Sequence, residues 1–209
     1  MRHTSEQKLH LLISNDFHSL IFISKYNLIH GSWITIIVLQ KKKLYGTGIW
    51  ICEHPEVKEY LKNILNAVRE ALTADITSIK SVNLIITDNQ GILLEKFAFD
   101  LLKIQFDAKE SDPYFLKTEE SLRTLCLKFS MLDSYLKPLP EDSIFSIELD
   151  THEAALVSLS ENPKCEDFPW IIRTDNSIET SGRTSLLPLY TVRTDHLALQ
   201  LFVIGDTKV

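Results

Sequence analysis

Histidine, carboxylate and cysteine side chains are the groups in this chain that could perform catalysis. Its 209 residues include seven histidines, 28 acidic residues and three cysteines, but no HExxH, GxSxG, P-loop or GxGxxG motif. His152 beside Glu153, and His54 before Pro55, fit the start of a helix better than a catalytic pair or a metal ligand. With six glycines in total, little is available to build a phosphate-binding loop. We therefore expect a protein that is not an enzyme and that uses no cofactor.

The cysteines give no sign of a metal centre. Cys52, Cys126 and Cys165 are far apart, and none lies in a CxxC or Cys/His pattern with ligand spacing. An odd number of scattered cysteines is typical of a protein from a reducing compartment. The sequence thus predicts no zinc site.

Charge and hydropathy restrict the class of partner. The net charge is −6 and the isoelectric point is near 5.6, so the chain as a whole would repel a phosphate backbone. We expect no direct binding to nucleic acid, and we interpret the basic run at 41–43 as a solvated turn. The apolar stretch 17–39 contains His18, Lys25 and Asn27, which predicts a buried core segment and not a membrane span. No signal-like leader is evident, so secretion is not expected.

Any binding site must be positioned by the elements of one α+β domain. The length and the 44% hydrophobic content suit a single core. Apolar spacing at three and four residues predicts helices, and β-branched or alternating runs predict strands. The helices are expected at 16–29, 55–72 and 118–136, and the strands at 34–40, 49–51, 82–87, 92–101, 145–150 and 197–204.

Local signals support two of these elements in particular. Pro55 stands where a first helical turn accepts proline, and Tyr60 follows on the same helix. The turn 88–91, which ends in a glycine, separates two strand-like runs and predicts a hairpin. A mostly antiparallel sheet packed against about three helices is the architecture that these patterns indicate.

The order of five short motifs resembles the HORMA domain family. The motifs are His54-Pro55-Glu56, Glu95-Lys96-Phe97-Ala98-Phe99-Asp100, Phe168-Pro169-Trp170, Leu186-Leu187-Pro188-Leu189 and Gln200-Leu201-Phe202-Val203. Within the family they resemble the branch of the non-catalytic accessory subunits of translesion DNA polymerase zeta. The resemblance implies one HORMA domain over 1–209, with a core at about 14–164 and a C-terminal seat belt at about 165–209. The family's Tyr-Pro element is replaced here by Trp33-Ile34.

The resemblance also implies a function. Such a protein clasps a proline-containing peptide of the catalytic subunit of DNA polymerase zeta. It also bridges that subunit to the C-terminal domain of a scaffold polymerase, a deoxycytidyl transferase, in DNA repair at damaged DNA in the nucleus. The alternative within the fold is a spindle-checkpoint HORMA protein that clasps mitotic partner peptides.

Two aromatic residues are the candidates for peptide binding. The resemblance places Trp170 where the seat belt begins and Tyr60 on the exposed edge of a helix that contacts the same peptide. An indole ring can cover an extended peptide while its N–H donates a hydrogen bond. Packing in the core is the other interpretation of both residues.

Two further groups of residues are candidates for protein contacts. The resemblance implies that Leu186, Gln200 and Phe202 bind the scaffold polymerase, with Phe202 in place of the family's tyrosine. Gln200 and Phe202 share a face of their strand, and core packing of Phe202 is the alternative. Arg123 and Ser134, both expected on the third helix, are the candidate contacts of a HORMA–HORMA dimer. The resemblance matches Arg123 to a position through which HORMA domains of this branch pair, and Ser134 to a position that usually holds alanine, while a solvated arginine is the alternative.

Overall fold

The computed structural model describes residues 39–75, 77–104, 116–152, 157, 170–173, 184–195 and 197–208. The predicted helix 16–29, Cys165, Phe168 and Pro169 lie outside these ranges. The described elements are β1 (Leu39–Leu44), β2 (Thr47–Cys52), α2 (Pro55–Ala74), β3 (Ile79–Thr87), β4 (Leu93–Ile104), α3 (Leu116–Ser130), the short 3₁₀ helix η1 (Leu132–Ser134), β5 (Ile144–Thr151), β6 (Ser185–Arg193) and β7 (Leu197–Gly205).

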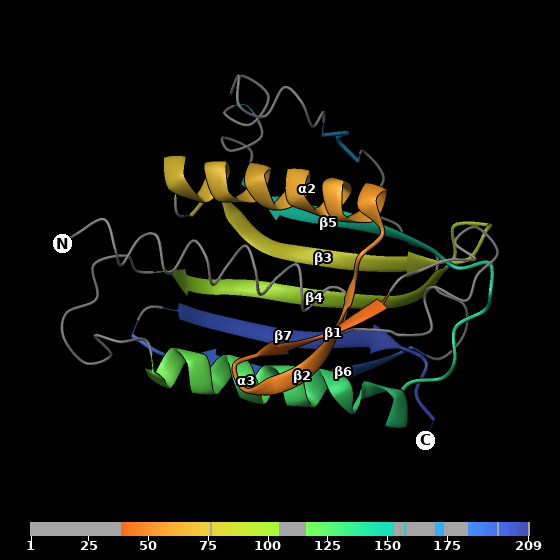
Figure 1. The fold of residues 1–209 in the computed structure, drawn as a ribbon. Helices are drawn as coiled ribbons and strands as arrows, with labels where there is room; N and C mark the ends of the chain where they lie inside the picture. The colour runs from red at the N-terminus through yellow and green to blue at the C-terminus, as the bar shows by residue number, and fades with distance from the viewer. Residues whose placement is uncertain are drawn as a thin grey trace.

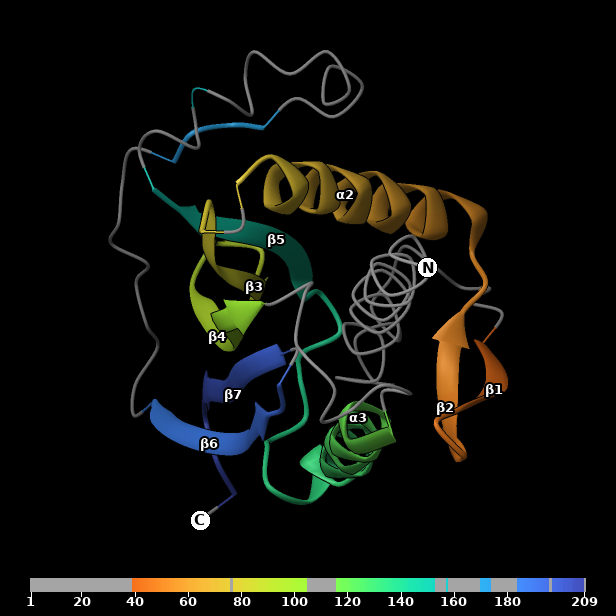
Figure 2. The same cartoon turned by 90° about the vertical axis from the view of Figure 1, so that its left-hand side faces the viewer.

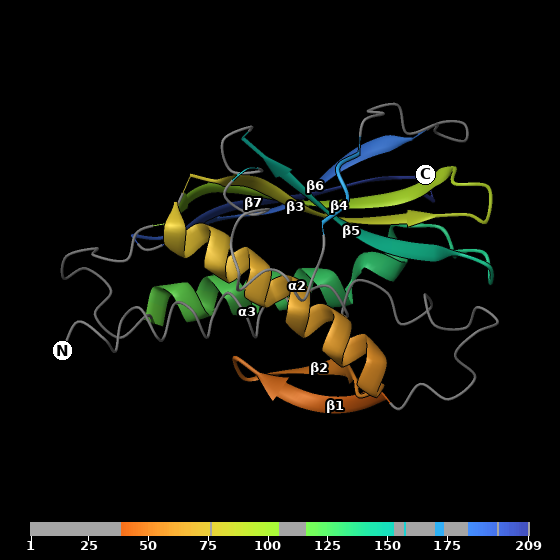
Figure 3. The same ribbon diagram turned by 90° about the horizontal axis from the view of Figure 1, so that it is seen from above.

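A five-stranded sheet forms the base of the molecule. Its strands are antiparallel throughout and lie in the order β5-β3-β4-β7-β6 (Figure 1). Helices α2 and α3 both cover one face, which we call the helix face, and the β1–β2 hairpin lies beyond them (Figures 2 and 3). The opposite face of the sheet is called the outer face below. The predicted α+β class with a mostly antiparallel sheet is confirmed.

The β3–β4 hairpin follows from its turn chemistry. Gly91 adopts a φ of 82°, which glycine accepts without steric cost. The Asp88 carboxylate accepts hydrogen bonds from the backbone N–H groups of Gln90 and Ile92, each at 2.9 Å. These bonds close the turn locally, which is why the hairpin was predictable from a few residues.

Helix α2 begins where the sequence predicts. Pro55 occupies the first turn and Glu56 places a carboxylate near the positive end of the helix dipole. The apolar positions at three and four residue steps are buried against the sheet, namely Leu61, Ile64, Leu65, Val68 and Leu72.

The end of α3 differs from the prediction. The helix stops at Ser130 and not at 136, and Ser134 belongs to η1. The Ser130 hydroxyl donates to the carbonyl of Leu127 at 2.7 Å, which competes with continued helical bonding. Leu136 then forms a bridge with Thr207, so the chain turns away towards the end of β7.

The interpretation of residues 41–43 as a turn was wrong. These lysines lie in β1 and pair with Gly48, Ile49 and Trp50 of β2, while the turn falls at Tyr45 and Gly46, both at positive φ. Of the strand predicted at 34–40, residues 39 and 40 belong to β1, and residues 34–38 lie outside the described ranges. Cross-strand pairing outweighs the polarity of the run because lysine side chains extend into solvent from a two-stranded ribbon.

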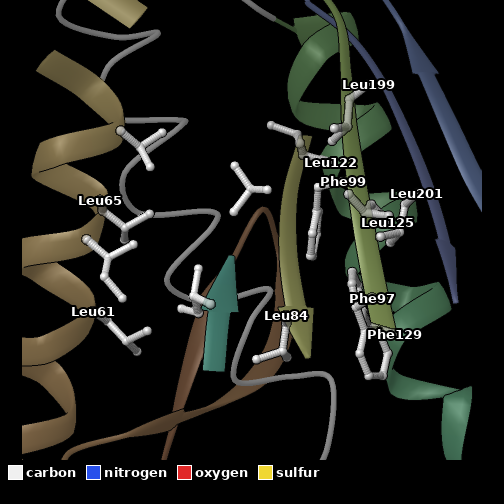
Figure 4. Packing of buried hydrophobic residues seen from close by; sticks show 14 of the residues in the cluster. Leu61, Leu65, Leu84, Phe97, Phe99, Leu122, Leu125, Phe129, Leu199 and Leu201 are labelled. Carbon is white, nitrogen blue, oxygen red and sulfur yellow. The ribbon is translucent and has the colours of Figure 1, made fainter. Parts of the chain in front are cut away.

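The core is built around a stack of phenylalanines between β4 and α3. Phe129 lies 6.4 Å from Phe97 and 6.1 Å from Phe99 between ring centroids, with all three side chains buried (Figure 4). Leu199 and Leu201 of β7 pack in the same cluster. This packing joins α3 to β4 and β7.

Glu53 joins the β1–β2 hairpin to α2. Its carboxylate accepts from Lys42 of β1 and from Lys58 of α2, each at 2.5 Å. The hydrogen bond from Lys42, followed by that from Lys58, lowers the pKa of Glu53 from its ordinary value of 4.5 to about 2. The folded protein therefore favours the ionised carboxylate.

We predict that Glu53→Gln lowers stability near neutral pH and that its effect fades in acid. Because the folded pKa is depressed, the contribution of Glu53 is present above about pH 4.5 and is lost as the pH falls towards 2. Thermal melts from about pH 7 to about pH 3 measure the difference. The control is Glu141→Gln, an exposed residue before β5. A difference that stays constant with pH would contradict the assignment.

Candidate functional site

One edge of the sheet is formed by β5. This strand pairs with β3 along its whole length, from Ile144 opposite Thr87 to Thr151 opposite Ile79. Among the described strands, none pairs with the other side of β5. Such an edge presents backbone N–H and C=O groups that can accept an added strand.

Tyr60 flanks this edge on the helix face. Its ring makes an edge-to-face contact with Phe145 at 6.1 Å, and it hydrogen-bonds to the backbone of Ile147. Burial raises the pKa of the Tyr60 hydroxyl, and the bond to Ile147 opposes part of this shift. The residue is half-buried, so it is less open than the exposed helix edge that we expected.

Trp170 and Arg173 lie on opposite sides of the β5 edge. Trp170 is partly buried against the core cluster, whereas Arg173 forms an ion pair with Glu148 of β5. Ile147 is buried under the helices, so alternation along the strand puts Glu148 on the outer face. Residues 170–173, which we call the strap, therefore pass from the helix face to the outer face across this edge (Figures 2 and 3).

The middle of the strap is apolar and open to solvent. Ile171 is 92% exposed and Ile172 is 66% exposed. Ile144, at the start of β5, is exposed as well. Exposed apolar side chains on or beside a strand edge that no described strand covers are typical of a surface that binds another chain.

Gln200 and Phe202, two of the residues expected to contact the scaffold polymerase, lie on β7 and face away from the core. Leu199, Leu201 and Val203 are buried on the helix face, while Gln200 and Phe202 alternate with them and are half-buried on the outer face. Phe202 is thus part of the outer surface and not of the core under the helices.

Leu186 joins this surface from the neighbouring strand. It pairs with Ile204, the next outer-face residue after Phe202, and it is 61% exposed. Pro188 lies opposite Phe202. The structure therefore brings Leu186, Gln200 and Phe202 onto one face, as expected.

A separate strand at residues 185–193 was not predicted, because Pro188 suggested only a bend. Proline is tolerated here since β6 is an edge strand and its ladder is interrupted by a bulge between Pro188 and Tyr190. Both features depend on the position of the strand in the sheet, which the sequence does not reveal.

Several residues at these surfaces were missed. Asp100 lies opposite Gln200 on the outer face, and burial raises the pKa of its carboxyl, with Lys96 opposing and Asp150 adding to the shift. Glu148 and Arg173 carried no sequence signal because they are 25 residues apart. Strand alternation could have placed Asp100, since it shares the parity of Lys96 and Ala98.

Arg123 and Ser134 lie on different elements. Both are exposed, Arg123 on α3 and Ser134 in η1 after the helix has ended. Arg123 lies at the β1–β2 turn, where a Cβ at Gly46 would be 4.0 Å from its Cζ. The expectation that both residues lie on one helix was wrong.

The described residues hold no group of three or more His, Cys, Asp and Glu side chains that could bind a metal. Cys52 and Cys126 are buried, and the Cys52 sulfur accepts a hydrogen bond from the backbone N–H of His54 at 3.4 Å. Across the same ranges, neither α-helix has the length and hydropathy needed to cross a membrane.

Comparisons with known proteins agree with this arrangement. The mitotic spindle assembly checkpoint protein MAD2B of Rattus norvegicus and that of Homo sapiens are each 29% identical to the chain over 166 residues, which cover 79% of the chain and 77% of the relative. The DNA polymerase zeta subunit 2 of Drosophila melanogaster is 25% identical over 169 residues, 80% of the chain and 83% of the relative. The sequence matches no family model.

Solved structures share the fold. A chain of the mitotic checkpoint complex superposes with a TM-score of 0.72 at 17% identity, covering 95% of this chain and 99% of that chain. The C. elegans protein HTP-2 bound to HTP-3 closure motif 1 gives a TM-score of 0.62 at 13% identity, covering 98% and 87%.

The two faces of β7 lead to a stability prediction. Leu201→Ala should lower the free energy of unfolding by about 2–5 kcal/mol, since it leaves a cavity in the buried cluster. Leu186→Ala should change it by about 0.5 kcal/mol or less, because the side chain is exposed. Urea denaturation of both variants compares the two effects. Equal losses would mean that the outer face is buried like the core.

Proposed function

We propose, since this chain has the HORMA fold and resembles MAD2B and DNA polymerase zeta subunit 2, that it is a non-catalytic adaptor of DNA polymerase zeta in translesion synthesis. It clasps a proline-containing peptide of the catalytic subunit and bridges that subunit to the scaffold deoxycytidyl transferase polymerase. Its place of action is the nucleus.

The strap across the β5 edge is the observation that carries the proposal. An extended peptide would add to β5 as a further strand and use backbone groups on the side of β5 that pairs with no described strand. Tyr60 and Trp170 would flank the peptide on the helix face, with Ile171 and Ile172 lying over it. Main-chain hydrogen bonds would supply affinity, and the aromatic rings would select the side chains of the peptide.

The outer face supplies the second binding surface. Leu186, Gln200 and Phe202 lie on the β6–β7 side of the sheet, away from β5 at the other edge. The two partners can therefore bind at the same time, which is what a bridging subunit requires. Pairing with another HORMA domain through Arg123 and Ser134 would use a third surface, on α3 and η1.

The alternative is a spindle-checkpoint HORMA protein that clasps mitotic partner peptides. The name of MAD2B, a spindle assembly checkpoint protein, is the observation that favours it. Capture from nuclear extract, followed by mass spectrometry, distinguishes the two functions. Recovery of polymerase subunits supports the adaptor of translesion synthesis, and recovery of checkpoint components without them supports the alternative.

We predict that Trp170→Ala weakens binding of a proline-bearing synthetic peptide from the catalytic subunit. Loss of an aromatic anchor should cost about 2 kcal/mol or more in binding free energy. Calorimetry measures the affinity, and circular dichroism checks the fold. Trp50→Ala is the matched control, because Trp50 is exposed on the β1–β2 hairpin. An unchanged affinity for a folded Trp170→Ala variant would refute the clasp.

A second prediction separates the two partners. The double variant Gln200→Ala with Phe202→Ala should weaken binding of the scaffold polymerase's C-terminal domain and leave the clasped peptide bound, since both side chains lie on the outer face. Co-purification of all three components tests this. Loss of both partners together would show that the two surfaces are not independent.

A further inference from the structure

The ion pair between Glu148 and Arg173 ties the strap to the edge strand. Arg173 Nη1 donates to Glu148 Oε1, and the two side chains are 47% and 32% exposed. Glu148 lies in the interior of β5 and opposite Asn83 of β3, so the pair is centred on the strand and not at its end.

The pair gives the strap a second point of attachment. On the helix face the strap is held by the packing of Trp170 against the core cluster. On the outer face it is held by Arg173, while the two isoleucines between are largely exposed. The segment that crosses the edge is thus fixed at both ends.

A strand added to β5 would lie between these two points. Neighbouring strands are about 4.8 Å apart, so a bound peptide occupies the space directly beneath the strap. An arginine side chain is long and flexible enough to lean across a neighbouring strand while its head group stays at the carboxylate. A peptide held beneath a closed strap leaves only when the strap lifts.

We propose that Glu148 and Arg173 are positioning residues for the clasped peptide, and that their ion pair holds the strap closed over the β5 edge. This rests on the proposed peptide clasp. The pair acts through the strap and slows release of the peptide. It adds little to the stability of the free protein, because both side chains are partly exposed.

The expected size of the effect is modest. Exposed ion pairs contribute on the order of 0.2–1 kcal/mol, which corresponds to a change of about 1.4- to 5-fold in a rate. Screening by salt should reduce it further, since solvent reaches both groups. Release should therefore accelerate as the salt concentration rises.

Charge exchange tests the proposal on the full chain. A fluorescently labelled, proline-bearing peptide from the polymerase zeta catalytic subunit is bound, and its release is followed after addition of unlabelled peptide. Arg173→Glu and Glu148→Arg should each speed release by about 1.4- to 5-fold. The double variant that exchanges the charges should restore slow release, which a misfolded single variant cannot explain.

The Lys137–Asp206 ion pair provides the matched control. It is exposed and lies outside the strap, so Lys137→Glu should leave the release rate unchanged. If the unaltered chain binds the peptide but all three Glu148 and Arg173 variants release it at the same rate as the unaltered chain, the ion pair does not hold the strap. If the unaltered chain does not bind the peptide at all, the proposed clasp itself fails, and this proposal fails with it.

Discussion

The pairing of β4 with β7 is the constraint on which the rest of the structure depends. The ladder runs from Glu95 opposite Gly205 to Ile104 opposite Leu197, and it puts β7 inside the sheet with β6 outside it. With β7 in this place, β6 takes one edge and β5 the other. The same ladder positions Leu199 and Leu201 against the phenylalanines of β4 and α3.

This strand order gives the sheet two separate candidate surfaces. On the helix face, β5 and α2 bring Phe145 to Tyr60, next to the open edge. On the outer face, β6 and β7 present Leu186, Gln200 and Phe202. One sheet thus keeps the two surfaces apart without a second domain, because β5 lies at one edge of the sheet and β6 at the other.

The parts of the fold that the sequence predicts are those with local causes. The helix that starts at Pro55 and the hairpin that turns at Gly91 follow from residues within a few positions of one another. The shared face of Gln200 and Phe202 follows from the two-residue period of a strand. The same local signals indicated a mostly antiparallel sheet packed against about three helices, whereas the seat belt was expected only from the resemblance to HORMA domains.

The parts that the sequence does not predict depend on distant partners. The sequence around Lys42 indicates a solvated turn, and only its pairing with β2 makes it a strand. Pro188 indicates a bend, and only the position of β6 at the sheet edge lets it lie in a strand. The end of α3 is set in part by the bridge between Leu136 and Thr207. The contact between Glu148 and Arg173 likewise needs the whole fold, since only the sheet edge brings them together.

The position of β7 has a consequence for synthesis of the protein on the ribosome. Strand β4 ends at Ile104, but its partner β7 begins only at Leu197. At roughly 5–20 residues per second, the unpaired side of β4 waits on the order of 5–20 seconds for that partner to emerge. During that interval the nascent chain presents a long apolar strand edge of the kind that chaperones shield. Slow codons between β4 and β7 would lengthen this exposure, so translation speed over that stretch should influence the yield of folded protein.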